Sequence, residues 1–355
     1  MAYTTIDDPS AHFQTLLYTG NATGRSLTNT GNSDLQPDLV WVKDRSTTND
    51  HKITDSSRLG GGRGPTRTLE SNTNAAEYDD QGEGSDATTS FDTDGFTIGT
   101  NGNYNTNTNS YVAWQWKANG GTRTTNTESG NNPAGGYQAN TTAGFSIVDY
   151  TGTGAAGTMA HGLGAVPHCI IFKARAGTEN WPVYHIATGN THACDLNRNV
   201  AKIDNATLFN DTTPTSSVFT VNSDSAINAD GVNYIAYCFT SIQGYSKFGS
   251  FKGTNNADGV FIYTGFKPAF FIWKRHDHST GWGLIDSTRN PTNQGFYQAF
   301  PHDTGEGNYA LGDFVSNGIK WRNTFADTNS VNDYLYMAFA ESPFVSSEGV
   351  PCTAR

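Results

Sequence analysis

The chain has 355 residues, a formal net charge of −11 and no apolar run long enough to cross a bilayer as a helix. Its acidic balance argues against sequence-independent nucleic-acid binding, which uses clustered Lys and Arg, and against attraction to an anionic membrane surface. With 39 glycines, 12% aromatic residues and only 15% charged residues, the composition is typical of a chain rich in strands and turns.

The first segment, residues 1–12, has neither the basic region nor the apolar region of a secretory signal. We therefore expect the protein to fold in a cytoplasm. We also expect its four cysteines to remain free thiols, because no C-x-x-C pair occurs. This N-terminal arm and the tail at 345–355 lie outside the repeat described next, and such ends are either disordered or held by a neighbour.

A pattern of about 100 residues, the size of a small domain, occurs three times along the chain. In each copy a proline begins an apolar run, a lysine follows six residues later, and a tyrosine opens a later apolar run. These repeated positions are Pro37, Pro167 and Pro268, then Lys43, Lys173 and Lys274, then Tyr111, Tyr234 and Tyr334. The repeat is too long for a solenoid unit. It predicts three tandem modules, at 13–118, 143–241 and 246–344.

Short strands are predicted in the first copy by apolar or alternating runs between Gly, Asn, Asp and Thr. They lie near 13–18, 38–44, 50–55, 89–91, 95–99 and 110–117. In FDTDGF, from Phe91 to Phe96, Asp-Gly between aromatic residues predicts a hairpin. Because we find no helical period with caps, we predict an all-β fold whose modules are β-sandwich-like.

Residues 119–142 have the composition of a flexible linker or long loop between the first and second modules. The second and third modules have no such spacer, so we expect them to dock rigidly. The runs CIIFK and FFIWK are apolar on successive residues, as in strands covered on both faces. Trp41, Phe172 and Trp273 lie in these runs and in the equivalent first run, and we expect them in the core.

Glycines at Gly152, Gly154 and Gly157 match the G-x-G-x-x-G spacing of a dinucleotide site. That chemistry requires a helix directly after the motif, to present its N-terminus to the phosphates. The residues that follow, TMAHGLGAVP, do not predict a helix. We interpret the motif as a hairpin loop and expect no cofactor.

His276 and His278, with Asp286 beyond them, are the cluster that most resembles a metal site. Histidines two apart on a strand share a face, and with a carboxylate they can hold a divalent cation. The other copies have Arg45 and Arg175 in this region, and HDHSTG also fits a polar hairpin turn. We take the turn as the interpretation and predict no metal site. An oxygen-rich turn with Asp224, Asn228 and Asp230 is a weaker calcium candidate.

Two copies carry the pattern D-S-x-R at the end of a predicted strand, with Asp55 and Arg58 in one and Asp286 and Arg289 in the other. The middle copy has His185 instead of the aspartate, so we predict a structural ion pair rather than a site. We find no G-x-S-x-G and no gathered His and acid residues. Paired carboxylates for glycoside cleavage remain open, because their separation exists only in the fold. We predict no catalytic residues and no enzyme activity.

Several strings of this sequence occur together in a recognisable combination: YTGNATGR, LQPDLVWVKDRSTTNDH, TTSFDTDGFTIG and YVAWQWKA. The opening TIDDPSAHFQTLLYTGN and the closing AFAESPFVSSEGVPCTAR belong to the same combination. Together they resemble virion structural proteins of marine tailed bacteriophages, in which such modules occur in tandem and in tail-fibre-like proteins. The resemblance covers nearly the whole chain and is most specific in the first module and at both ends.

This resemblance implies a virion location, assembly in the host cytoplasm and a non-enzymatic role, most simply as a tail fibre or tail-associated appendage that contacts a host surface glycan. The alternatives are a capsid decoration or head-fibre protein and, second, a polysaccharide-degrading tailspike enzyme. Expected partners are other virion proteins and copies of the chain itself, as a homotrimer, although three internal modules could instead give one chain a pseudo-threefold shape. We expect one or both ends to dock the chain onto such a partner.

Overall fold

The computed structural model describes residues 3–58, 65–82, 85–127 and 129–352, and this part of the chain is built mainly from strands. Its helices are three single turns, α1 (Gly102–Asn105), α2 (Ala206–Phe209) and α3 (Ser225–Asn228), and the 3-10 turn η1 (Pro9–Ala11). The predicted all-β fold is therefore confirmed. No helix among the described residues is long and apolar enough to cross a membrane.

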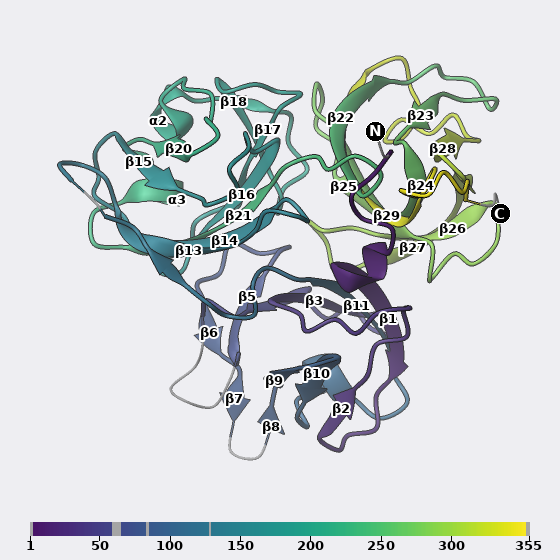
Figure 1. The fold of residues 1–355 in the computed structure, drawn as a ribbon, viewed down its shortest axis with the longest axis horizontal. Helices are drawn as coiled ribbons and strands as arrows, with labels where there is room; N and C mark the ends of the chain where they lie inside the picture. The colour runs from purple at the N-terminus through teal and green to yellow at the C-terminus, as the bar shows by residue number, and fades with distance from the viewer. Residues whose placement is uncertain (1–2, 59–64, 83–84, 128, 353–355) are drawn as a thin grey trace.

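Three lobes surround a common centre (Figure 1). The first contains a six-stranded sheet, in the order β1 (Phe13–Thr19), β11 (Ser110–Trp116), β3 (Leu39–Asp44), β4 (Lys52–Asp55), β5 (Arg67–Glu70) and β6 (Tyr78–Asp79). Two small sheets complete it, formed by β2 (Arg25–Leu27), β10 (Gly95–Ile98) and β9 (Thr88–Asp92), and by β7 (Gln81–Gly82) and β8 (Ser85–Asp86). The hairpin predicted from Asp-Gly is β9–β10, in which Phe91 pairs with Phe96 and Gly95 takes a φ of +98°.

The second lobe contains an eight-stranded sheet and a two-stranded sheet. The large sheet has the order β12 (Thr124–Thr125), β13 (Ala134–Asn140), β14 (Phe145–Thr151), β21 (Asn233–Phe239), β16 (Cys169–Ala174), β17 (Pro182–His185), β18 (His192–Asp195) and β19 (Ile203–Asp204). The small sheet pairs β15 (Gly157–Ala160) with β20 (Val218–Val221). Gly154 lies in the loop between β14 and β15 with a φ of +68°, so this glycine motif forms a connection between strands.

The third lobe is one eight-stranded sheet, with β22 at one edge and β23 at the other. Its order is β22 (Ser246–Lys252), β29 (Asp333–Pro343), β24 (Phe266–Arg275), β25 (Trp282–Asp286), β26 (Gly295–Ala299), β27 (Glu306–Val315), β28 (Gly318–Trp321) and β23 (Phe261–Tyr263). All three large sheets share one feature. The last long strand of each lobe lies between the strand near the repeated proline and one earlier strand, which is β1, β14 or β22, as β1-β11-β3, β14-β21-β16 and β22-β29-β24.

A single hydrophobic core joins the lobes where their last strands meet. Trp116, Phe239 and Phe339 come from the first, second and third lobes, and their ring centroids lie 5.7 to 6.5 Å apart. Each lobe also has its own core on the outer side of its large sheet. Trp41 belongs to the shared core, whereas Phe172 and Trp273 belong to the outer cores, and all three are buried as predicted.

The expected linker at 119–142 is partly a strand. Within it, β13 pairs along its whole length with β14, from Ala134 opposite Thr151 to Asn140 opposite Phe145. Among the described strands of the sheet, only the two-residue β12 lies beyond β13, and the backbone hydrogen bonds of the ladder hold β13 without an apolar side-chain pattern.

The repeated prolines do not all stand at strand starts. Pro37 and Pro167 precede β3 and β16 by two residues, but Pro268 lies inside β24. The register of β24 with β29 shifts on both sides of Pro268. A proline cannot donate to the ladder, and such irregularities are where sheets accommodate it.

Both described ends of the chain are held by the chain itself. The Tyr3 hydroxyl donates to the Gly265 carbonyl at 2.6 Å, and the Thr4 hydroxyl donates to the Gln243 carbonyl at 2.8 Å. In the tail, the Ser347 amide donates to the Asp7 carboxylate at 2.6 Å. These contacts hold the described parts of both ends against the rest of the chain and against each other.

Candidate functional site

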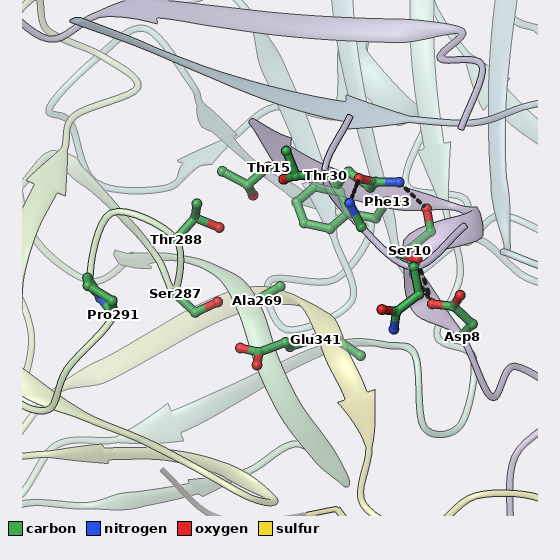
Figure 2. Close-up of a pocket in the computed structure, with 14 residues that line it drawn as sticks. Asp8, Ser10, Phe13, Thr15, Thr30, Ala269, Ser287, Thr288, Pro291 and Glu341 are labelled. Atoms are coloured by element: carbon green, nitrogen blue, oxygen red, sulfur yellow. Dashed lines mark hydrogen bonds between the residues drawn. The ribbon is translucent and has the colours of Figure 1, made fainter. Parts of the chain in front are cut away.

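A cleft with a volume of about 510 Å³ lies between the N-terminal arm with β1 and the loop after β25 (Figure 2). Ser10 and Thr15 line one side, and Ser287, Thr288 and Glu341 line the other. The lining is therefore dominated by hydroxyl and carboxylate groups contributed by the first and third lobes.

Polar groups on the arm side of this cleft hold the arm in place. The Gln14 amide donates to the Ser10 and Ser33 carbonyls and accepts from the Gly31 amide, at 2.8 to 2.9 Å. Burial opposes ionisation of Asp8, but hydrogen bonds from Ser10 and Ser33 outweigh it, so that the pKa of Asp8 is lowered. These contacts hold the arm against the loop before β3 within the first lobe.

The residues considered as metal ligands from the sequence have separate structural roles. His276 and His278 lie at the turn between β24 and β25, as the hairpin interpretation predicted, while Asp286 ends β25 and pairs with Arg289. Among the residues that the structure describes, no group of three or more His, Cys, Asp or Glu side chains could hold a metal ion. Asp224 caps α3 by accepting from the Ala226 amide.

The first D-S-x-R pattern forms a buried ion network between the first and second lobes. Arg58 donates to Asp55 at 2.6 Å and to Glu77 at 3.1 Å, and both arginine and aspartate side chains are fully buried. Two residues of the second lobe join this network. Arg175 donates two hydrogen bonds of 2.9 Å to the Glu77 carboxylate, and the Tyr237 hydroxyl donates to Asp55 at 2.6 Å. Burial alone raises the pKa of Glu77, but its two arginine partners outweigh burial and lower it.

The second D-S-x-R pattern forms the same network between the third and first lobes. Arg289 pairs with Asp286 and donates to Glu306 at 2.9 Å, and from the first lobe Arg45 reaches Glu306 at 3.1 Å. The indole of Trp114 donates to Asp286 at 3.1 Å, in the role that Tyr237 has in the other network. The structural ion pair predicted from the sequence is confirmed in both places, and its extension across lobes was not predicted.

The junction between the second and third lobes uses a neutral histidine instead. His185 Nδ1 accepts from the Ala187 amide, so Nε2 carries the proton and donates to the Tyr336 carbonyl at 3.1 Å. Burial lowers the pKa of His185 to about 3. The change from aspartate to histidine at this position therefore keeps a contact between lobes while it removes the charge.

The repeated lysines are buried beside these junctions. Lys173 donates to the Asn74 and Glu179 carbonyls, and Lys274 donates to the Thr280 carbonyl, so each holds a turn. Burial lowers the pKa of both amines to about 8. Such a pKa also occurs in catalytic lysines. Here Lys43, Lys173 and Lys274 are at most 1% exposed, which fits a structural role.

The repeated tyrosines each bridge one short turn, which is helical in the first two lobes as α1 and α3. The Tyr111 hydroxyl donates to the Gly102 carbonyl and accepts from the Thr106 amide, both at 2.9 Å. Tyr234 and Tyr334 make the same pair of contacts to the turns before them, with lengths of 2.7 to 3.0 Å. Each ring also stacks on an aromatic residue of the first strand of its lobe, at 4.7 to 5.2 Å between centroids.

Sequence reasoning missed a buried asparagine at the end of each of these turns. The Asn105 amide accepts from the Asn21 amide and donates to the Thr23 and Gly99 carbonyls, all at 2.8 Å. Asn228 and Asn329 bond the equivalent loops in the same way. Their spacing from the repeated tyrosines, five or six residues, was the signal that could have found them.

A comparison with family models gives one match: a family described as a domain of unknown function, DUF7483, covers residues 8–343. No curated protein and no solved structure matches the chain. The matched stretch begins beside η1 and ends with β29, so it includes all three lobes and the core that they share. The protein belongs to the DUF7483 family.

Proposed function

We propose that this protein is a non-enzymatic structural component exposed on a bacteriophage particle, most simply a tail fibre or tail-associated appendage that contacts the host surface. We further infer that residues 13–118, 143–241 and 246–344 are three copies of one β-sandwich-like module. The recurrence of one strand order and one set of buried contacts around a shared core carries the module inference, and the sequence resemblance to virion structural proteins supports the particle role.

The repeated contacts support the module inference more strongly than the strand order alone. Tyr111, Tyr234 and Tyr334 bridge equivalent turns, and Asn105, Asn228 and Asn329 anchor equivalent loops. Side chains in the same register with the same partners are hard to keep without a common fold.

The use of the ionisable groups supports a structural role. Arg58 and Arg289 are fully buried in networks that tie one lobe to the next. Lys173 and Lys274 hold backbone carbonyls and lie over the rings of Trp181 and Trp282. Groups of this kind serve catalysis when a substrate can reach them, whereas here they stabilise junctions, which disfavours the tailspike-enzyme alternative.

The arrangement of the lobes bears on assembly. One chain already places three similar lobes around a centre, so it can present approximately threefold surfaces without forming the homotrimer expected from the sequence (Figure 1). Contacts with copies of itself and with other virion proteins remain part of the proposal.

Immunogold labelling of purified particles, combined with mass spectrometry of the same preparation, tests the proposal. We expect the chain in gradient-purified particles at a fixed copy number, with gold at the tail. Gold on the head instead would favour the decoration or head-fibre alternative. If the chain remains with host debris and is missing from particles, the proposal is wrong.

A further inference from the structure

A groove crosses the third lobe beside the hairpin of β26 and β27. It consists of two adjoining cavities of about 280 Å³ each, which share Gln298, Phe300, Tyr309 and Asp327. We call it the aromatic groove and define it by Gln298, Phe300, His302, Asp303, Tyr309, Phe325 and Asp327. Each cavity alone lies near the lower end of the roughly 300–1,000 Å³ range of small-molecule sites.

Three aromatic rings form a continuous series along this groove. Phe300 and Tyr309 meet edge to face at 6.5 Å between centroids, and Tyr309 and Phe325 do so at 6.1 Å. Tyr309 is 44% exposed and Phe325 is 45% exposed, so large ring surfaces face solvent. Aromatic rings that combine an apolar face with neighbouring polar groups are typical of binding surfaces.

Between the rings lies a glutamine whose side-chain amide lacks a protein partner. Gln298 is only 4% exposed and lines both cavities. Within the described residues, its side-chain amide makes no hydrogen bond, although its backbone pairs with Gly307. An amide that lines a cavity without a protein partner can both donate to and accept from a ligand there. A ligand with both donors and acceptors would satisfy it.

The equivalent positions of the other two sheets are filled by protein. Gln298 is the residue before Ala299, which pairs with Leu284. In the other two sheets the equivalent residues are Thr68 and Ala193, which come directly before the residues that pair with Ile53 and Val183. The Thr68 hydroxyl meets the Tyr104 hydroxyl at 3.1 Å in a buried contact. Ala193 belongs to a buried cluster with Leu208 and Phe209 of α2. Only the third of these positions combines a glutamine with a hollow.

Polar groups on the groove wall complete a mixed set of donors and acceptors. His302 Nδ1 accepts from the Trp282 amide at 3.1 Å, so Nε2 of the neutral ring carries the proton and can donate. Burial, followed by the positive charge of Lys274, lowers the pKa of His302 to about 4, so this ring is neutral near pH 7. Asp303 and Asp327 add carboxylates that accept hydrogen bonds and repel anions.

We propose that the aromatic groove binds a neutral saccharide, with a sugar face against Tyr309 and sugar hydroxyls bonded to the Gln298 amide. Hydroxyl groups both donate and accept, so they match an amide that needs both. A quaternary ammonium ion would suit the rings but would leave Gln298 unsatisfied, and an acidic sugar would meet Asp303 and Asp327. The inference deepens the proposed function, because it gives the host-surface glycan a location on the chain.

A neutral and acidic oligosaccharide array probed with the full chain tests this site. Isothermal titration with the methyl glycoside of the best neutral saccharide then gives its affinity. We expect Tyr309→Ala to weaken binding at least tenfold through loss of stacking, and Gln298→Met to do so through loss of hydrogen bonds. Phe261→Ala, which removes a ring that is 43% exposed elsewhere on the third sheet, should leave affinity within twofold.

Thermal melting separates loss of a ligand group from loss of the fold. Gln298→Met preserves volume and removes an amide that has no hydrogen bond to the described residues, so the ligand-free variant should melt at the same temperature as the parent or higher. A clear fall in its melting temperature would show that the amide has a structural partner and would overturn the proposal. So would failure to bind any neutral saccharide, unchanged affinity in both variants, or selective binding of tetramethylammonium in the groove.

The binding measurement uses the purified chain and is independent of particle location. A chain that is missing from particles but binds a neutral saccharide in the groove would refute the virion role and leave the groove intact. A chain that is present in particles but binds no saccharide would support the virion role and refute the groove proposal.

Discussion

The Arg58 and Arg289 side chains are fully buried at the lobe junctions, so removing one of them leaves a buried carboxylate without its arginine partner. Arg58→Met would leave Asp55 unpaired and weaken the hold on Glu77. We expect the free energy of unfolding, measured by chemical denaturation, to fall by about 3–5 kcal/mol, as for other broken buried pairs.

An exposed ion pair in the same lobe provides the control for Arg58. Arg67 lies 3.8 Å from Asp79, and both side chains are more than one-third exposed. Water screens such a pair, so Arg67→Met should change stability by less than about 1 kcal/mol. Equal losses in the two variants would mean that burial does not set the energy of the Arg58 network.

His185 predicts a dependence of stability on pH. Its pKa is about 3 in the folded protein and 6.5 ordinarily, so between these pH values the unfolded chain binds a proton that the folded chain does not bind. The stability that follows is fully present above about pH 6.5 and is lost as pH falls toward the folded pKa. Denaturation at pH 7 and pH 4 should show that His185→Gln reduces this loss by roughly 2–4 kcal/mol.

His278→Gln, at the exposed turn between β24 and β25, is the matched control and should follow the parent profile. A His185→Gln variant with the full parental loss between pH 7 and pH 4 would assign that loss to other groups.

At the scale of single elements, the turn before each repeated tyrosine depends on one buried asparagine. Asn105→Ala would remove three hydrogen bonds and leave the Asn21 amide and two carbonyls without them. We expect destabilisation of about 2–4 kcal/mol, since a net hydrogen bond is worth roughly 1 kcal/mol and unmet buried groups add to this. Asn103→Ala, in the same turn but half-buried, should change stability by less than about 0.5 kcal/mol, and a similar effect of both would contradict the assignment.

At the scale of the whole molecule, the shared core predicts that the three lobes unfold together. Phe339 contacts Trp116 of the first lobe and Phe239 of the second. Phe339→Ala should lower stability by about 3–5 kcal/mol and shift one calorimetric transition as a unit. Separate transitions for individual lobes in the parent would show that the shared core does not couple them.

The N-terminal arm belongs to this same unit. Ile6 is buried in the shared core, and Tyr3 and Thr4 bond to the third lobe and to the segment before it. Deletion of residues 1–12 should therefore lower the melting temperature, rather than leave the fold intact as expected for an arm that serves only assembly. An unchanged melting temperature would restore the view of the arm as an assembly anchor.

The sequence by itself determined the features that depend on neighbouring residues. Alternating and apolar runs located strands such as β1, β3 and β11 to within two residues, and Asp-Gly located the β9–β10 hairpin. The ion pair of Asp55 with Arg58 could also be predicted from the sequence, because the two residues are three positions apart. These features follow from local backbone preference and side-chain burial, which act over a few residues.

Only the tertiary structure decided the contacts between distant segments. Arg45 meets Glu306 across 261 residues of sequence, and Trp116, Phe239 and Phe339 meet from three lobes. The ladder that makes β13 a strand comes from backbone groups of β14, which composition does not encode. In the sequence Gln298 is an ordinary polar residue, and only the fold buries it beside Phe300 and Tyr309. The reason is that the pairing of strands, and not the neighbouring residues in the sequence, decides which groups surround a side chain.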